Sequence, residues 1–118
     1  MMYIEIGGHV LEVALCQNAA VDALKALLEK GAITLCMKDF AHMEKFTSLG
    51  TTLPSSDEYI TTQAGDVILS DGHLLVLYYA SNTWQFTRLG KVQNRTDVEL
   101  KKILGSGNLQ ARLSLEIE

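Results

Sequence analysis

Residues 64–79 constrain the fold of this chain more than any other segment. Two short apolar runs, at residues 67–69 and 74–79, are separated by a turn that contains Asp71-Gly72. A tight turn between antiparallel strands needs positive φ at its two central positions, which Asp tolerates and Gly adopts freely. The segment therefore predicts a β-hairpin, and it favours a β-rich domain.

Strand patterns recur along the rest of the chain. Gly7-Gly8 separates the first two alternating runs, which therefore predict a second hairpin, and Gly90 inside a long run predicts a bulge or a bend. Residues 50–57 contain the only proline and are expected to form a loop. Alternation of apolar and polar residues predicts further strands at residues 3–6, 10–15, 33–38, 43–49, 58–62, 83–92 and 109–118.

Two segments have helical signals at both ends. Asn18 can act as an N-cap before apolar residues at helical spacing, and Gly31 follows the last of them. Thr96 and Glu99 have the spacing of a capping box, and Gly105 is placed to end the short helix that follows. We therefore expect helices over about residues 19–30 and 97–104.

About eight strands with one apolar face each, and only two helices, indicate a sheet that closes on itself. Closure removes the exposed strand edges that would otherwise invite aggregation. The predicted fold class is mainly β: a closed eight-stranded barrel with a helix over each open end. At 118 residues, the chain is expected to be one domain over residues 1–118.

Composition narrows the classes of partner. Fourteen acidic residues against ten basic ones give a net charge of −4, which argues against nucleic acid as a partner. No apolar run approaches the roughly 18 residues that cross a membrane, and no signal peptide is visible, so a cytoplasmic location is predicted. Cys16 and Cys36 lack metal-ligand spacing; Cys36 is expected to be buried, and a disulfide between the two stays open. No cofactor is predicted.

Four motifs carry a family resemblance. They lie at residues 64–69, 75–79, 86–92 and 104–108, in an order and spacing that resemble the small bacterial cyclophilin-like proteins. Residues 37–40 and 44–46 also look like the segment that follows the first helix in that family. The resemblance covers essentially the whole chain, and it implies the eight-stranded cyclophilin β-barrel with two capping helices.

The resemblance implies little about activity. True cyclophilins isomerise prolyl bonds with a strand arginine followed by a Phe-Met-x-Gln segment, and this chain has no such segment. Met43-Glu44-Lys45-Phe46 falls in the comparable region and offers Glu44 where a guanidinium would be needed. A carboxylate cannot donate the hydrogen bond that would help to lower a barrier of about 20 kcal/mol. We therefore expect a protein without prolyl isomerase activity.

A ligand-binding groove is the expected functional site. Aromatic and flexible apolar side chains on neighbouring strands would form its walls and bind a short peptide or a small molecule. Arg88 could anchor an acidic ligand, or it could pair with an acid such as Asp66 or Glu44. The predicted ligand-binding residues are Met37, Glu44, Phe46, Tyr79, Trp84, Phe86 and Arg88.

Two alternatives stay open. One is an enzyme, either a degenerate prolyl isomerase or one that uses a cluster of Asp39, His42 and Glu44 for acid–base or metal chemistry. The other is a module that self-associates through an exposed aromatic face. Tyr78 and Tyr79 end a strand together, so one ring must face inward and the other outward. The sequence leaves the oligomeric state open.

Overall fold

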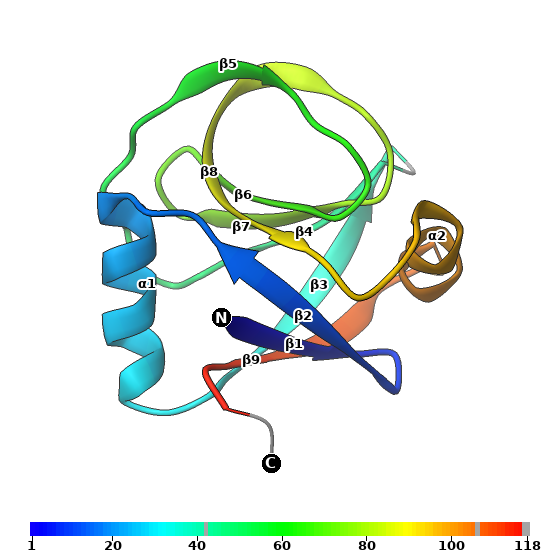
Figure 1. The fold of residues 1–118 in the computed structure, drawn as a ribbon, viewed down its shortest axis with the longest axis horizontal. Helices are drawn as coiled ribbons and strands as arrows, with labels where there is room; N and C mark the ends of the chain where they lie inside the picture. The colour runs from blue at the N-terminus through cyan, green and yellow to red at the C-terminus, as the bar shows by residue number, and fades with distance from the viewer. Residues whose placement is uncertain (42, 106, 117–118) are drawn as a thin grey trace.

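A computed structural model describes residues 1–41, 43–105 and 107–116 of the chain. In this part of the chain there are nine β-strands and two α-helices (Figure 1). In chain order these are β1 (Met2–Ile6), β2 (His9–Leu15), α1 (Ala19–Glu29), β3 (Ile33–Phe40), β4 (Glu44–Ser48), β5 (Glu58–Thr61), β6 (Asp66–Ser70), β7 (Leu74–Tyr78), β8 (Thr83–Val92), α2 (Asp97–Leu104) and β9 (Leu109–Ser114).

Eight of the strands close into an antiparallel barrel. Their order is β2-β1-β9-β3-β4-β7-β6-β8, and β8 returns to pair with β2. The ninth strand, β5, pairs with the first half of β8 and lies outside the barrel, at the top of Figure 1. The predicted mainly β fold, a closed eight-stranded barrel with two helices, is confirmed.

The Asp71-Gly72 turn has the predicted geometry. Asp71 has φ 52° and Gly72 has φ 73°, so both residues adopt positive φ. The turn joins β6 to β7 in register, with Val67 opposite Leu77. The strongest local signal in the sequence therefore forms a hairpin of the barrel wall.

The predicted irregularity at Gly90 is a β-bulge. Val67 lies opposite Gly90 but Ile68 lies opposite Arg88, so β8 carries one extra residue, Leu89. A Cβ atom on Gly90 would lie 2.5 Å from the carbonyl oxygen of Ala14 on β2. Only glycine fits without displacing backbone here, and the close approach lets β8 pair with β2 and close the barrel.

Both helices bury one face against the barrel interior, and they lie on opposite sides of it (Figure 1). The Asn18 side chain accepts a hydrogen bond of 2.9 Å from the Val21 amide, and Thr96 and Glu99 form the predicted capping box. The helix residues within the main core are Ala20, Val21, Leu24, Leu28, Leu100, Ile103 and Leu104.

Two local predictions need correction. Cys36 is exposed rather than buried, because its neighbour Met37 takes the inward-facing position on β3; it and Cys16 are both free thiols. The last strand ends at Ser114, whereas the prediction extended it to residue 118; residues 117 and 118 lie outside the described residues. Neither helix in the described part of the chain is long and apolar enough to cross a membrane.

Candidate ligand-binding groove

Successive side chains of β4 and β7 face opposite sides of the barrel wall. Lys45 and Leu77 lie opposite each other on the inward face, whereas Glu44 and Tyr78 lie opposite each other on the outward face. This alternation places two different polar clusters back to back on one pair of strands. The outward cluster borders a cavity.

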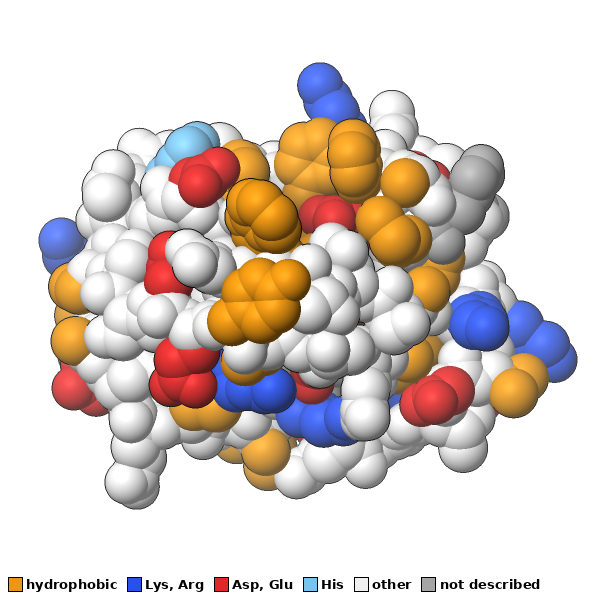
Figure 2. Space-filling view, turned by 90° about the horizontal axis from the view of Figure 1, so that it is seen from above, with side chains coloured by type: hydrophobic (Ala, Val, Ile, Leu, Met, Phe, Trp, Pro, Cys, Tyr) orange, Lys and Arg blue, Asp and Glu red, His pale blue; other side chains and the backbone are white. Residues whose placement is uncertain are grey.

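This cavity, which we call the outer groove, has a volume of about 280 Å³. Its walls come from the outward faces of the barrel strands and from the first half of β8, which extends beyond the barrel with β5. On the face seen in Figure 2, hydrophobic side chains gather around an acidic one. The outer groove is lined by Phe40, Glu44, Phe46, Ser70, Leu74, Val76, Tyr78, Asn82, Trp84 and Phe86.

Aromatic rings dominate the walls. Phe40 and Phe46 meet edge to face with centroids 6.2 Å apart, and Tyr78 and Phe86 meet at 5.7 Å. Tyr78 and Phe86 belong to a small buried apolar cluster that is separate from the barrel core. Trp84 is 63% exposed and Phe40 is 54% exposed, so the groove has a packed floor and open aromatic rims, an arrangement typical of binding surfaces.

A short hydrogen-bonded chain forms the polar part of the floor. The Tyr78 hydroxyl donates to the Glu44 carboxylate, and the Asn82 amide donates to Tyr78 over 3.2 Å. Burial raises the pKa of Glu44; the bond from Tyr78 opposes this shift, and the nearby charge of Asp39 adds to it. Burial also raises the pKa of Tyr78, to about 12, so this hydroxyl keeps its proton at neutral pH.

The inward face carries a second acid–tyrosine pair, and here the pair includes a lysine. The ammonium group of Lys45 is fully buried and lies 3.0 Å from a carboxylate oxygen of Asp39. Lys45 also donates to the Gly107 carbonyl, and the Tyr79 hydroxyl donates to Asp39. Burial and the bond to Asp39 raise the pKa of Tyr79. We call Lys45, Asp39 and Tyr79 the interior cluster.

The structure brings together four of the seven predicted ligand-binding residues. Glu44, Phe46, Trp84 and Phe86 all line the outer groove. Met37 and Tyr79 do not line the outer groove, because both face inward and belong to the main core.

Arg88 shares the outward face of β8 with Trp84 and Phe86 but lies beyond the groove lining. One of its guanidinium nitrogens is 3.9 Å from a carboxylate oxygen of Asp66. Lys91 approaches the other oxygen of Asp66 at 3.8 Å. Of the two roles considered from the sequence, the ion pair with Asp66 is the one the structure displays.

The alternative acid–base cluster is not assembled in the described residues. Asp39 and Glu44 lie on opposite faces of the β3–β4 pair, since Asp39 pairs with Lys45 and Phe40 pairs with Glu44. His42 lies outside the described residues. Within the part of the chain that the structure describes, no group of three His, Cys, Asp or Glu side chains could hold a metal ion.

The sequence reasoning missed three important groove residues: Phe40, Tyr78 and Asn82. A signal existed for Tyr78, because one ring of the Tyr78-Tyr79 pair had to face outward. Phe40 is the cross-strand neighbour of Glu44, and this becomes visible only once the β3–β4 register is known. Asn82 lies in the connection between β7 and β8, and nothing in its local sequence marks it.

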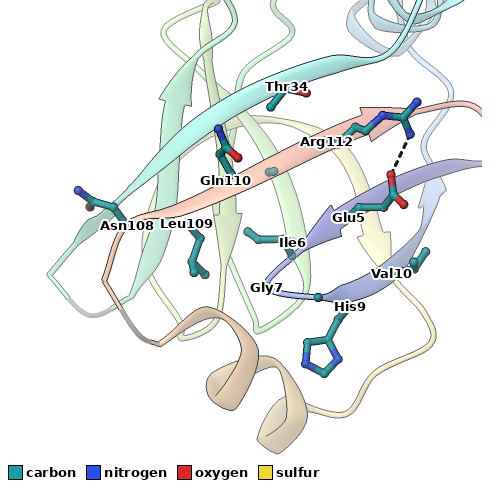
Figure 3. Close-up of a pocket in the computed structure, with 12 residues that line it drawn as sticks. Glu5, Ile6, Gly7, His9, Val10, Thr34, Asn108, Leu109, Gln110 and Arg112 are labelled. Carbon is teal, nitrogen blue, oxygen red and sulfur yellow. Dashed lines mark hydrogen bonds and ion pairs between the residues drawn. The ribbon is translucent and has the colours of Figure 1, made fainter.

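A second, larger hollow of about 640 Å³ lies elsewhere, beside β9. Figure 3 shows it between β3 and the β1–β2 hairpin, with Glu5 and Arg112 meeting across neighbouring strands. Their ion pair is 2.8 Å long, and both side chains are partly exposed. Its lining, among the residues that the structure describes, has no Phe, Tyr or Trp, so the outer groove is the better candidate for a specific site.

The fold and the groove together define a class: a small closed β-barrel protein with an aromatic cleft on its outer wall. A family model described as the cyclophilin-like family matches residues 4–116, and the chain belongs to that family. Searches of curated proteins and of solved structures gave no match.

Proposed function

We propose that this protein binds a short peptide or a small molecule in the outer groove and does not isomerise prolyl bonds. The observation that carries the proposal is an aromatic cavity of about 280 Å³ on the outer wall, with Trp84 on its exposed rim. Apolar pockets with a few convergent polar groups are the usual sites for such ligands. Family membership adds the barrel but does not by itself specify the chemistry.

The polar floor of the groove supports the proposed absence of isomerase activity. Isomerisation is helped by a group that donates a hydrogen bond to the twisted amide, whereas a carboxylate such as that of Glu44 is a hydrogen-bond acceptor. The neighbouring hydroxyl of Tyr78 already donates to Glu44. Neither group is therefore placed to supply the donor.

Two measurements test this proposal. Prolyl isomerisation of an unstructured proline peptide should proceed at the uncatalysed rate at high protein concentration, with a true cyclophilin as the positive control. Blocked tripeptides of varied composition should change the fluorescence of Trp84, which is the only tryptophan. A catalysed rate would overturn the first half of the proposal, and the absence of any fluorescence or calorimetric response would overturn the second.

Self-association through the same exposed rings is the competing hypothesis for the role of the groove. Phe40 and Trp84 are more than half exposed, so a second copy of the chain could cover them. Light scattering across a range of concentrations separates the cases. A monomer that binds peptides supports the proposal, whereas a dimer whose formation abolishes peptide binding contradicts it.

A further inference from the structure

The floor of the outer groove carries a carboxylate without a matching cation. Glu44 is only 9% exposed, and it borders the cavity. The ion pairs found among residues 1–41, 43–105 and 107–116 do not include Glu44. A buried carboxylate with one hydroxyl partner is poorly compensated, so a cation delivered from outside would lower its free energy.

The walls favour the same kind of ligand. The faces of aromatic rings are regions of negative potential, and they attract organic cations that come within about 6 Å of the ring centroid. Phe40, Phe46, Trp84 and Phe86 line the same cavity as Glu44 and come from three strands, β3, β4 and β8. A neutral apolar ligand would use only the rings, and an anion would be repelled by the carboxylate.

We propose that the occupant of the outer groove is a peptide segment that inserts an arginine side chain, with its guanidinium group on Glu44. This inference rests on the proposed peptide binding. A guanidinium is planar and more weakly hydrated than an ammonium, so it can stack on a ring while it donates within its plane to a carboxylate. Ser70 supplies a second oxygen acceptor on the lining.

Three other charged side chains near the groove lie outside its lining. Lys38 shares the outward face of β3, opposite Phe46, but it does not line the groove. Arg88 lies farther along β8, with a guanidinium nitrogen 3.9 Å from a carboxylate oxygen of Asp66 on β6. The exposed Glu58 on β5 lies opposite Phe86 and is outside the groove lining. Glu44 is therefore the charge that a ligand inside the cavity would meet first, and Glu58 provides a matched control.

The test uses a pair of blocked tripeptides that differ in charge alone. Acetyl-Ala-Arg-Ala-amide and its citrulline counterpart have nearly the same shape, and only arginine is cationic. Each is titrated into the intact protein, with Trp84 fluorescence as the readout. We expect the arginine peptide to bind at least about tenfold more tightly, which is the scale of one charge-assisted hydrogen bond.

Substitutions then show which carboxylate is responsible for the arginine preference. Glu44→Gln should bring the affinity for the arginine peptide down to that for the citrulline peptide. The control variant Glu58→Gln should keep the difference, because Glu58 lies outside the cavity lining. Circular dichroism confirms that each variant is folded before titration.

The outcomes separate this inference from the proposed function. Equal binding of the arginine and citrulline peptides, or an arginine preference that survives Glu44→Gln, would overturn the arginine assignment and leave peptide binding intact. Equal binding of the lysine analogue would overturn the selection for guanidinium. No binding of any peptide, including proline and apolar ones, would overturn the proposed function itself.

Discussion

On each face of the β4–β7 pair, an acidic side chain is hydrogen-bonded to a tyrosine, but only the inward face adds a lysine. On the inward face, the interior cluster joins an acid, a tyrosine and a buried lysine, with Lys45 and Asp39 3.0 Å apart. On the outward face, Glu44 and Tyr78 are also hydrogen-bonded, but no lysine or arginine of the described residues pairs with Glu44. The first acid has its countercharge supplied by the chain; the second does not.

This difference indicates a difference in role. A buried charge that is fully compensated by the fold contributes to structure, and removing one partner is costly. A buried charge that is incompletely compensated lowers stability, and such groups are found where a ligand supplies the missing partner. Substitutions on each face in turn test whether the two acids differ in role.

The largest effect is expected from Lys45→Met. The variant leaves Asp39 without its buried cation, and the free energy of unfolding should fall by about 3 kcal/mol. Urea denaturation measures the loss. The double variant Lys45→Met/Asp39→Leu should recover a large part of it, since both charges are then absent; a double variant as unstable as the single one would contradict the charge-pair explanation.

A smaller and directly comparative effect is expected from the two tyrosines. Tyr79→Phe removes a donor from Asp39, whose side chain is 18% exposed and keeps its bond to Lys45, and should cost about 1 kcal/mol. Tyr78→Phe removes the hydroxyl partner of Glu44, which is 9% exposed, and should cost about 2 kcal/mol because a buried acceptor loses its donor. Thermal or urea unfolding of the pair checks the order, and a reversed order would contradict the contrast between the two faces.

An effect of opposite sign is expected from Glu44→Gln. Burial raises the pKa of Glu44 above 4.5, so the folded state binds the proton more tightly than the unfolded state does. The native protein therefore loses stability as the pH rises through the interval between 4.5 and the folded-state pKa.

The Glu44→Gln variant has no carboxyl group to ionise at this position, so it should be more stable than the native protein at neutral pH. The advantage should shrink as the pH is lowered toward 4.5. Unfolding of both proteins at a series of pH values measures the difference. An advantage that stayed constant with pH would remove the titration of Glu44 as its cause.

The smallest change in stability is expected from Trp84→Ala. Trp84 is 63% exposed, so the free energy of unfolding should change by less than about 0.5 kcal/mol. Peptide binding, followed by calorimetry because the fluorophore is gone, should nevertheless weaken by about tenfold or more. A variant that is strongly destabilised would instead assign Trp84 to the packing of the barrel.

The fold was predictable because its signals are local and agree with each other. Asp71-Gly72 specifies a turn, Thr96 and Glu99 specify a helix start, and Gly90 marks the bulge beside the closing contact. Each of these depends on only a few neighbouring residues. Alternation then supplies the inward faces of the strands, which is enough to indicate a closed sheet.

The site was only partly predictable, because which way a side chain faces depends on strand register. A shift of one residue exchanges the two faces, and this is why the sequence selected Tyr79 for the groove whereas Tyr78 lies in it. Lys45 shows the same difficulty, since a charged residue in an inward position interrupts the apolar alternation of β4. Its partners Asp39 and Gly107 lie on other segments of the chain, so no local pattern identifies the pair.

The position of β5 has a consequence for how such a protein can diversify. In the described part of the chain, β5 is hydrogen-bonded only to the half of β8 that carries Trp84 and Phe86, whereas closure uses the other half, at Gly90. Substitutions in β5 can therefore shift the half of β8 that contributes Trp84 and Phe86 to the groove, while the barrel seam at Gly90 keeps its pairing. One scaffold could in this way acquire new recognition properties without having to be stabilised again at each step.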